Sequence, residues 1–224
     1  MAQFCDASEL LGKLWCFGPD HNGPNVVVDV AKDCQHLDQV KDSVIASFQW
    51  ASAEGVLANE NMRGIRFDLL DSEISEDPSM CGRSEIVPTA RRCFYASVLT
   101  AQPRLLEPTY LVEIQCHETA LENTYHVVSA RRGYIIEEMP SGGSGTLLIK
   151  AYLPVSESFG FSSELRLKTN DDQTLSQCFI DYWQTVPGDP LDPASKCGKI
   201  VQEIRRIKGM KAEMPNAGDF LDKI

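Results

Sequence analysis

The residue types that most often carry catalysis or bind metals do not form a motif in this sequence. The eight cysteines lie far apart, and no two have the two-residue spacing that a zinc ribbon or a thioredoxin-like site requires. The four histidines, His21, His36, His117 and His126, fall in different expected elements, with no acid or nucleophile at motif spacing. We therefore expect no metal site and no catalytic residue, and we interpret the cysteines as reduced thiols.

A phosphate-binding loop of the GTPase type is also not found in the sequence. Such a loop reads Gly-x-x-x-x-Gly-Lys-Ser/Thr, because its backbone N–H groups surround the phosphates and its hydroxyl binds Mg²⁺. Gly12-Lys13 is followed by Leu14, and Gly198-Lys199 is followed by Ile200. We expect this chain to bind neither GTP nor Mg²⁺ and not to be an enzyme.

Two pairs of adjacent arginines are candidates for contact with nucleic-acid phosphates. Arg91 and Arg92 lie on the polar side of one expected helix, and Arg205 and Arg206 lie near the end of another. The net charge of -11 opposes binding by the chain as a whole, so any such contact must be local. The alternatives are a solvated or ion-paired helix face for the first pair and a favourable helix-dipole interaction for the second.

The first pair is predicted to be positioned by a small domain of βαβ type. The expected elements are a strand at 25–30, a helix at 37–51, a strand at 65–69, an exposed loop at 72–85 and a helix that begins at Pro88. Apolar residues recur at steps of three and four in both helices and alternate with polar residues in the second strand. Together with the segment before it, this gives a domain at 12–104.

The rest of the chain predicts a second small domain and a tail. Strands near 110–114, 134–137, 147–153 and 178–182 alternate with helices near 121–128 and 160–167. The order strand-helix-strand-strand-helix-strand is that of the ferredoxin-like split βαβ fold, here at 105–186. The tail, 187–224, contains a basic helix with Ile200, Val201, Ile204 and Ile207 on its apolar face. The expected fold class is therefore α+β.

The sequence also suggests where the protein resides. The first residues carry no basic start and no apolar core of signal-peptide length, and no segment approaches the roughly 20 apolar residues of a membrane span. We therefore expect a cytoplasmic protein that contacts neither a membrane nor DNA.

Five stretches spread over the chain resemble the eukaryotic elongation factor 2 family, ribosomal translocases related to bacterial elongation factor G. They are WCFGPD at 15–20 with GPN at 23–25, KDSV at 41–44 with FQWA at 48–51, PTARRC at 88–93 with LTAQPRL at 99–105, KAYLPV at 150–155 with ESFGF at 157–161, and PGDPLD at 187–192 with DFLDKI at 219–224. Because all five occur in order, the match covers nearly the whole chain.

The resemblance implies the late part of the family's fourth domain, its ferredoxin-like fifth domain and a C-terminal extension that folds back toward the fourth domain. It implies a ribosome partner, with contacts to rRNA and to tRNA and mRNA at the decoding site, during GTP-dependent translocation. The family's GTP and Mg²⁺ belong to an N-terminal domain. Because the resemblance implies only the late part of the fourth domain, we expect the strand at 25–30 to expose a sheet edge.

The tip loop departs from the family pattern. Met80 stands where the family has a histidine that is modified to diphthamide, and only Gly82 remains of a following glycine run. We take Met80, Gly82 and Arg83 as further candidates for ribosome contact, together with the arginine pairs. Three other interpretations stay open: a stand-alone ribosome- or protein-binding module, a structural protein of the splicing machinery, and a degenerate copy without function, which the changed tip loop favours.

Overall fold

The fold is given by a computed structural model that describes residues 12–31, 34, 36–75, 77, 81–141, 145–170 and 174–221. The chain divides into two compact units, one made of Met1–Pro103 with Gly188–Ile224, the other of Arg104–Pro187. The C-terminal extension is thus part of the first unit. Among the described residues, no helix has the length and apolar character needed to cross a membrane.

The first unit is built on a three-stranded sheet. Its strands are β1 (Leu14–Gly18), β2 (Asn25–Asp29) and β3 (Arg66–Leu69), in the order β1-β2-β3. The strands β2 and β3 are parallel and are joined through α2 (Leu37–Ala53), which confirms the predicted βαβ arrangement. The sequence did not predict β1, which pairs antiparallel with β2. The expectation that the strand at 25–30 forms a free edge is wrong, because β2 lies between two partners.

The helix α3 (Arg83–Thr100) begins five residues before the predicted start at Pro88. The amides of Glu85 and Ile86 both donate to the carbonyl of Gly82 at 3.0 Å, and these bonds form the first turn. Pro88 lies in the second turn, where it removes one backbone donor, yet the helix continues through it. The loop predicted to extend to residue 85 therefore ends earlier.

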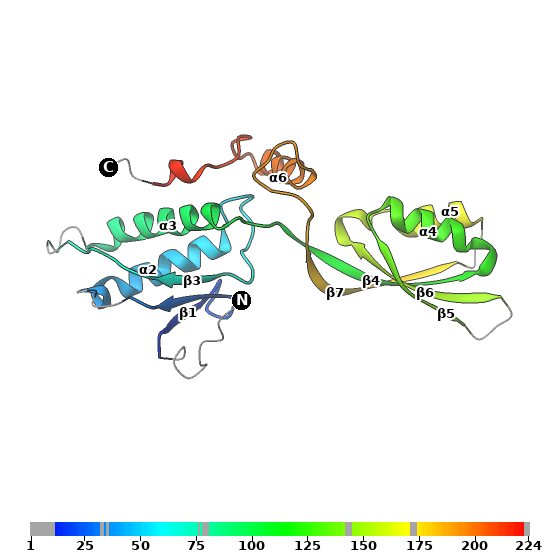
Figure 1. The fold of residues 1–224 in the computed structure, drawn as a ribbon, viewed down its shortest axis with the longest axis horizontal. Helices are drawn as coiled ribbons and strands as arrows, with labels where there is room; N and C mark the ends of the chain where they lie inside the picture. The colour runs from blue at the N-terminus through cyan, green and yellow to red at the C-terminus, as the bar shows by residue number, and fades with distance from the viewer. Residues whose placement is uncertain are drawn as a thin grey trace. The chain divides into compact units, whose positions relative to one another are not determined.

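The core of the first unit lies between its sheet and two helices, α2 and α3, which run side by side (Figure 1). Phe48 of α2, Phe67 of β3 and Phe94 of α3 meet at its centre, with ring centroids 4.9–5.9 Å apart. Val40 and Val44 lie on the same buried face of α2 as Phe48. These positions follow the three- and four-residue spacing of the sequence.

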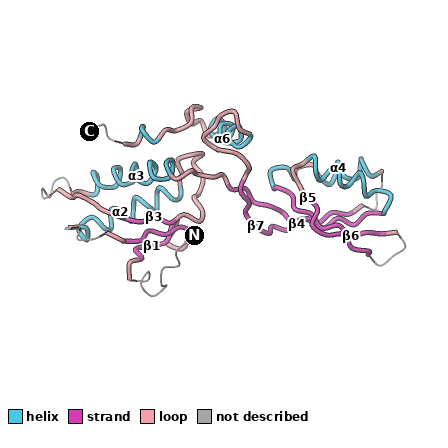
Figure 2. Tube along the Cα trace, viewed as in Figure 1, coloured by secondary structure: helices cyan, strands magenta, loops and turns pink. Residues whose placement is uncertain are grey.

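The second unit confirms the predicted ferredoxin-like fold. Its elements are β4 (Leu106–His117), the short η1 (Glu118–Ala120), α4 (Leu121–Ala130), β5 (Tyr134–Pro140), β6 (Thr146–Pro154), the short η2 (Val155–Glu157), α5 (Phe161–Thr169) and β7 (Leu175–Thr185). The antiparallel sheet has the order β5-β6-β4-β7. Helices α4 and α5 lie on one side of the strands (Figures 1 and 2), and the core between them contains Val112, Ile149 and Phe161.

The extension contains α6 (Lys196–Ile207) and the short η3 (Ala217–Asp219). The hydroxyl of Ser195 accepts a hydrogen bond from the amide of Gly198 at 2.8 Å and caps α6. The predicted apolar face is partly wrong. Val201 is fully buried, but Ile207 is 72% exposed, and the buried side of α6 includes Arg205.

Candidate functional site

Gly82 and Arg83 lie together at the N-terminal end of α3. Gly82 is the N-cap residue, in an extended conformation that other residues also adopt (φ -63°, ψ 148°), and Arg83 is the first helical residue, with an exposed side chain. The first amides of a helix and its dipole favour anions, and the cationic side chain of Arg83 adds a further positive charge at this end of α3. Met80, the third candidate in this region, lies outside the described residues.

Arg91 belongs to a compact group of four side chains that joins α2 to α3. Its guanidinium lies 3.7 Å from the ring centroid of Trp50, and its Nη2 donates to Glu54 Oε2 at 3.1 Å. Its Nε donates to the Tyr95 hydroxyl at 2.9 Å, and the Trp50 indole donates to the same Glu54 oxygen at 2.9 Å. Arg91 is therefore ion-paired, which is one of the alternatives that the sequence left open for it, although the sequence did not identify its partners.

The other member of this pair, Arg92, is half-buried and has an interaction partner within the protein. It follows Arg91 directly in α3, so the two side chains point about 100° apart around the helix axis. The two adjacent arginines therefore do not form one cationic patch.

Arg205 cannot serve as the surface cation that the sequence suggested. Its side chain is 6% exposed, and its guanidinium donates to the carbonyls of Leu57 at 2.7 Å and Lys211 at 2.8 Å, with a longer contact to Val56. Burial lowers the pKa of Arg205, since the charged form loses hydration. We correct this prediction: Arg205 attaches the extension to the first unit.

Arg206 has the opposite environment from its neighbour. Its side chain is 72% exposed and pairs with Glu203, three residues earlier on the same helix, at 2.6 Å. This hydrogen-bonded pair raises the pKa of Arg206 and lowers that of Glu203. An exposed ion pair of this kind is weak, so the guanidinium stays accessible to a stronger anionic partner.

Three cationic side chains, one from α3 and two from the C-terminal extension, contact the connection between α2 and β3. Arg91 contacts it at Glu54, and Arg205 contacts it at Leu57. Lys208 reaches the carbonyl of Asn59 at 2.7 Å and also pairs with the carboxylate of Glu60. Sequence reasoning missed Trp50, Glu54 and Tyr95, although the spacing of four residues between Trp50 and Glu54, and between Arg91 and Tyr95, indicates neighbours on one helix face.

Two further arginines, which the sequence analysis did not single out, stabilise the second unit. Arg132 forms a two-pronged pair with Glu107 at 2.7 and 2.9 Å and also contacts Glu157. Its hydrogen bonds to Glu107 raise the pKa of Arg132. Arg131 pairs with Glu164 at 2.6 Å and donates to the backbone carbonyl of Glu157. Both cations are satisfied within the unit.

Comparison with known families decides what these two units are. The family described as "Elongation factor G, domain IV" matches residues 12–102, and the one described as "Elongation factor G C-terminus" matches residues 104–194. The two matches are consecutive and together span most of the chain. The chain belongs to the elongation factor G family. It is a translation elongation factor region that contains domain IV and the ferredoxin-like C-terminal domain.

The phosphate-loop chemistry of GTPases does not fit the residues of this elongation factor region. Gly12 and Lys13 lead into the strand β1 instead of a helix. Gly198 is buried in α6, where a Cβ atom would lie 2.0 Å from the carbonyl oxygen of Asp192. Neither glycine-lysine pair therefore forms a loop that could surround phosphates.

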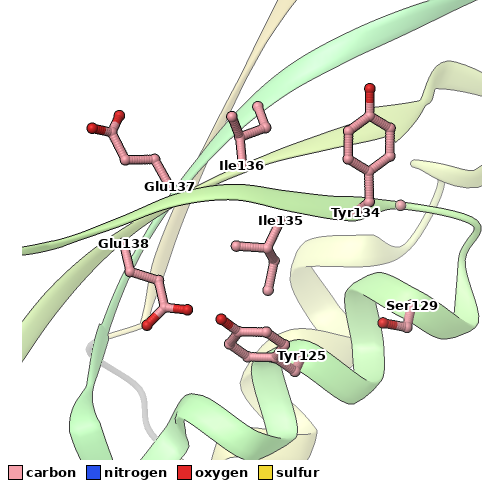
Figure 3. A pocket seen from close by; sticks show the side chains of 8 residues that line it. Tyr125, Ser129, Tyr134, Ile135, Ile136, Glu137 and Glu138 are labelled. Carbon is pink, nitrogen blue, oxygen red and sulfur yellow. The ribbon is translucent and has the colours of Figure 1, made fainter.

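A hollow of about 380 Å³ in the elongation factor's second unit does not suit RNA either. It lies between α4 and β5, where Figure 3 shows Tyr125 and Glu138 pointing toward each other. Of the two carboxylates in its lining, Glu138 points toward Tyr125, whereas Glu137 points to the other side of β5 and pairs with Lys150 at 3.2 Å. The lining residues include no Lys or Arg that would attract a phosphate group. The candidate cations lie elsewhere, on the first unit. In the described part of the chain, no group of three or more His, Cys, Asp or Glu could hold a metal ion.

Proposed function

We propose that this chain is the ribosome-facing region of eukaryotic elongation factor 2 and takes part in GTP-dependent movement of tRNA and mRNA through the ribosome. The observation that carries the proposal is the consecutive match of two elongation factor G domains over residues 12–194. The five stretches that resemble elongation factor 2, including PTARRC at 88–93 and DFLDKI at 219–224, support the more specific assignment.

We place the ribosome contacts on the exposed cations of the first unit. Arg83 at the start of α3 and Arg206 on α6 are exposed, whereas Arg205 is buried and Arg91 is engaged with Glu54. Contacts to rRNA, tRNA and mRNA would be local, because phosphate binding depends on cations at the surface and the net charge is -11. In this proposal the chain works in the cytoplasm.

The chain's own part in translocation is binding and not catalysis. We assign GTP and Mg²⁺ to another domain of the factor, since neither glycine-lysine pair here is followed by Ser or Thr. This division is consistent with a translocase in which one domain hydrolyses GTP and another makes contacts at a distance.

The decisive experiment is sedimentation of the purified chain with 80S ribosomes at low and near-physiological salt. We compare the wild type with Arg83→Glu and, as a control of equal charge change on an exposed residue of the second unit, Arg166→Glu. We expect saturable binding that falls with salt and competes with intact elongation factor 2. Loss of one phosphate contact should lower the slope of log affinity against log salt by about 0.7–0.9.

Two results would contradict this proposal. The first is a chain that does not bind ribosomes at all at low salt, which would leave a family fold without the family's function. The second is an equal effect of Arg83→Glu and Arg166→Glu, which would show that the net charge matters and not the α3 end.

A second candidate function is a stand-alone module that binds ribosomes without any GTP-driven cycle. It is favoured by the sequence of this chain, in which neither glycine-lysine pair belongs to a phosphate-binding loop. Binding that is the same in the presence and absence of intact factor with GTP, and that does not compete with it, would support this alternative.

A further inference from the structure

The end of the described chain returns to the middle of α3. The turn η3 is stabilised by a capping box, in which the Asn216 side chain accepts from the amide of Gly218 and the Asp219 carboxylate accepts from the amide of Asn216. This turn places the ring of Phe220 against the ring of Tyr95, with centroids 5.5 Å apart and planes at 79°. Phe220 also packs against the core of the first unit.

Tyr95 is one of three residues that hold Arg91, together with Glu54 and Trp50. The Tyr95 hydroxyl donates to the backbone carbonyl of Glu54 at 2.5 Å and accepts from Arg91 Nε at 2.9 Å. Burial raises the pKa of Tyr95, so the hydroxyl stays protonated and keeps donating. Arg91 in turn stacks on Trp50, a side chain that is 46% exposed.

We propose that Phe220 is a positioning residue: by holding the ring of Tyr95, it sets the orientation of Arg91 and Trp50 at the surface of the first unit. The three contacts form a continuous series from the C-terminal extension to α2. The ring of Phe220 packs edge-to-face against the ring of Tyr95 and so restricts rotation about the Cα–Cβ bond of Tyr95, the rotation that decides where the hydroxyl lies. Without Phe220, the hydroxyl loses its fixed place between Glu54 and Arg91.

The side chain of this group that lies most open to a partner is Trp50, an aromatic ring on which a base could stack. Arg91 supports that ring and is itself held by Glu54. A role of Trp50 in RNA contact rests on the proposed function. The positioning of Arg91 by Phe220 is a property of the first unit and can be tested without ribosomes.

The test uses NMR of the full chain labelled with ¹⁵N-tryptophan. The indole N–H of Trp50 donates to Glu54, so its resonance reports on the group directly. Trp15, in the same unit, and Trp183, in the other, are internal controls. The variants are Phe220→Ala, Phe220→Tyr, which keeps the ring, and Leu221→Ala, which removes the exposed neighbouring side chain.

We expect Phe220→Ala to shift the Trp50 resonance by more than its line width and to leave those of Trp15 and Trp183 in place. Phe220→Tyr and Leu221→Ala should both give the wild-type spectrum. Tyr95→Phe should reproduce the Trp50 shift, and the double variant with Phe220→Ala should add nothing to it.

Three outcomes would overturn the inference. They are an unmoved Trp50 resonance in Phe220→Ala, an equal shift in Leu221→Ala, and shifts of Trp15 as large as those of Trp50, which would mean general loosening of the unit. Ribosome sedimentation of the wild type beside Phe220→Ala separates the positioning role from the proposed function. If the wild type does not bind ribosomes, the proposed function fails, while the Trp50 result still decides the positioning role.

Discussion

Replacing Arg205 should destabilise the first unit far more than replacing its neighbour Arg206. Arg205 is 6% exposed and donates to two carbonyls at 2.7 and 2.8 Å, whereas Arg206 is 72% exposed and makes one ion pair along its own helix. The two residues are adjacent in sequence and identical in type. The comparison therefore isolates the effect of environment.

The magnitude follows from the contacts that are lost. A hydrogen bond from a charged donor contributes about 1.5–3 kcal/mol, and a buried carbonyl left without a donor is costly. Two such bonds give a gross loss of about 3–6 kcal/mol, which is reduced by the hydration that buried Arg205 gives up in the wild type. We expect Arg205→Ala to lower the free energy of unfolding by about 3 kcal/mol. Arg206→Ala should leave it nearly unchanged, because an exposed ion pair contributes little.

Urea unfolding followed by tryptophan fluorescence measures this difference. The background variant Trp183→Phe removes the second unit's tryptophan, so the signal comes from Trp15 and Trp50 in the first unit. Arg205→Met keeps the apolar stem and should lose nearly as much as Arg205→Ala, because the carbonyls still lack donors. Equal midpoints for the Arg205 and Arg206 variants would refute the reasoning.

Two other predictions concern the second unit. Arg132→Ala should lower the free energy of unfolding of the second unit by about 3 kcal/mol, because the Glu107 carboxylate, 7% exposed, loses its bidentate partner. The double variant Arg132→Ala with Glu107→Gln should recover part of this loss. An unchanged urea midpoint in Arg132→Ala would contradict the prediction. The hydrogen bond with Tyr134, together with burial, raises the pKa of Tyr182 to about 12. In the unfolded chain the Tyr182 hydroxyl ionises near pH 10, so its contribution to the free energy of unfolding is full below pH 10 and is lost as the pH rises toward 12. Tyr182→Phe should remove the last step of the ultraviolet tyrosinate titration, and a last step that persists in this variant would rule this out.

The order of elements could be read from the sequence because it depends on local periodicity. Val40, Val44 and Phe48 recur at helical spacing and are buried on one face of α2. The alternation in β4 and β6 likewise predicted the strands of the ferredoxin-like sheet, and the resemblance of five sequence stretches to elongation factor 2 pointed to the family. Where the local signal was weak, prediction failed: β1 is a five-residue strand before a glycine-proline turn, and α3 passes through Pro88.

The roles of the arginines were decided only by tertiary structure. The sequence shows Arg205 and Arg206 as equivalent cations, and helical spacing alone puts Arg205 four residues after the buried Val201. Whether a buried guanidinium is acceptable there depends on the carbonyl of Leu57, which is 148 residues away in the chain. The same holds for Arg91, whose partners are Trp50 of α2 and Glu54, the C-cap residue of that helix. Local sequence sets which face of a helix a residue occupies, and long-range packing sets what that face meets.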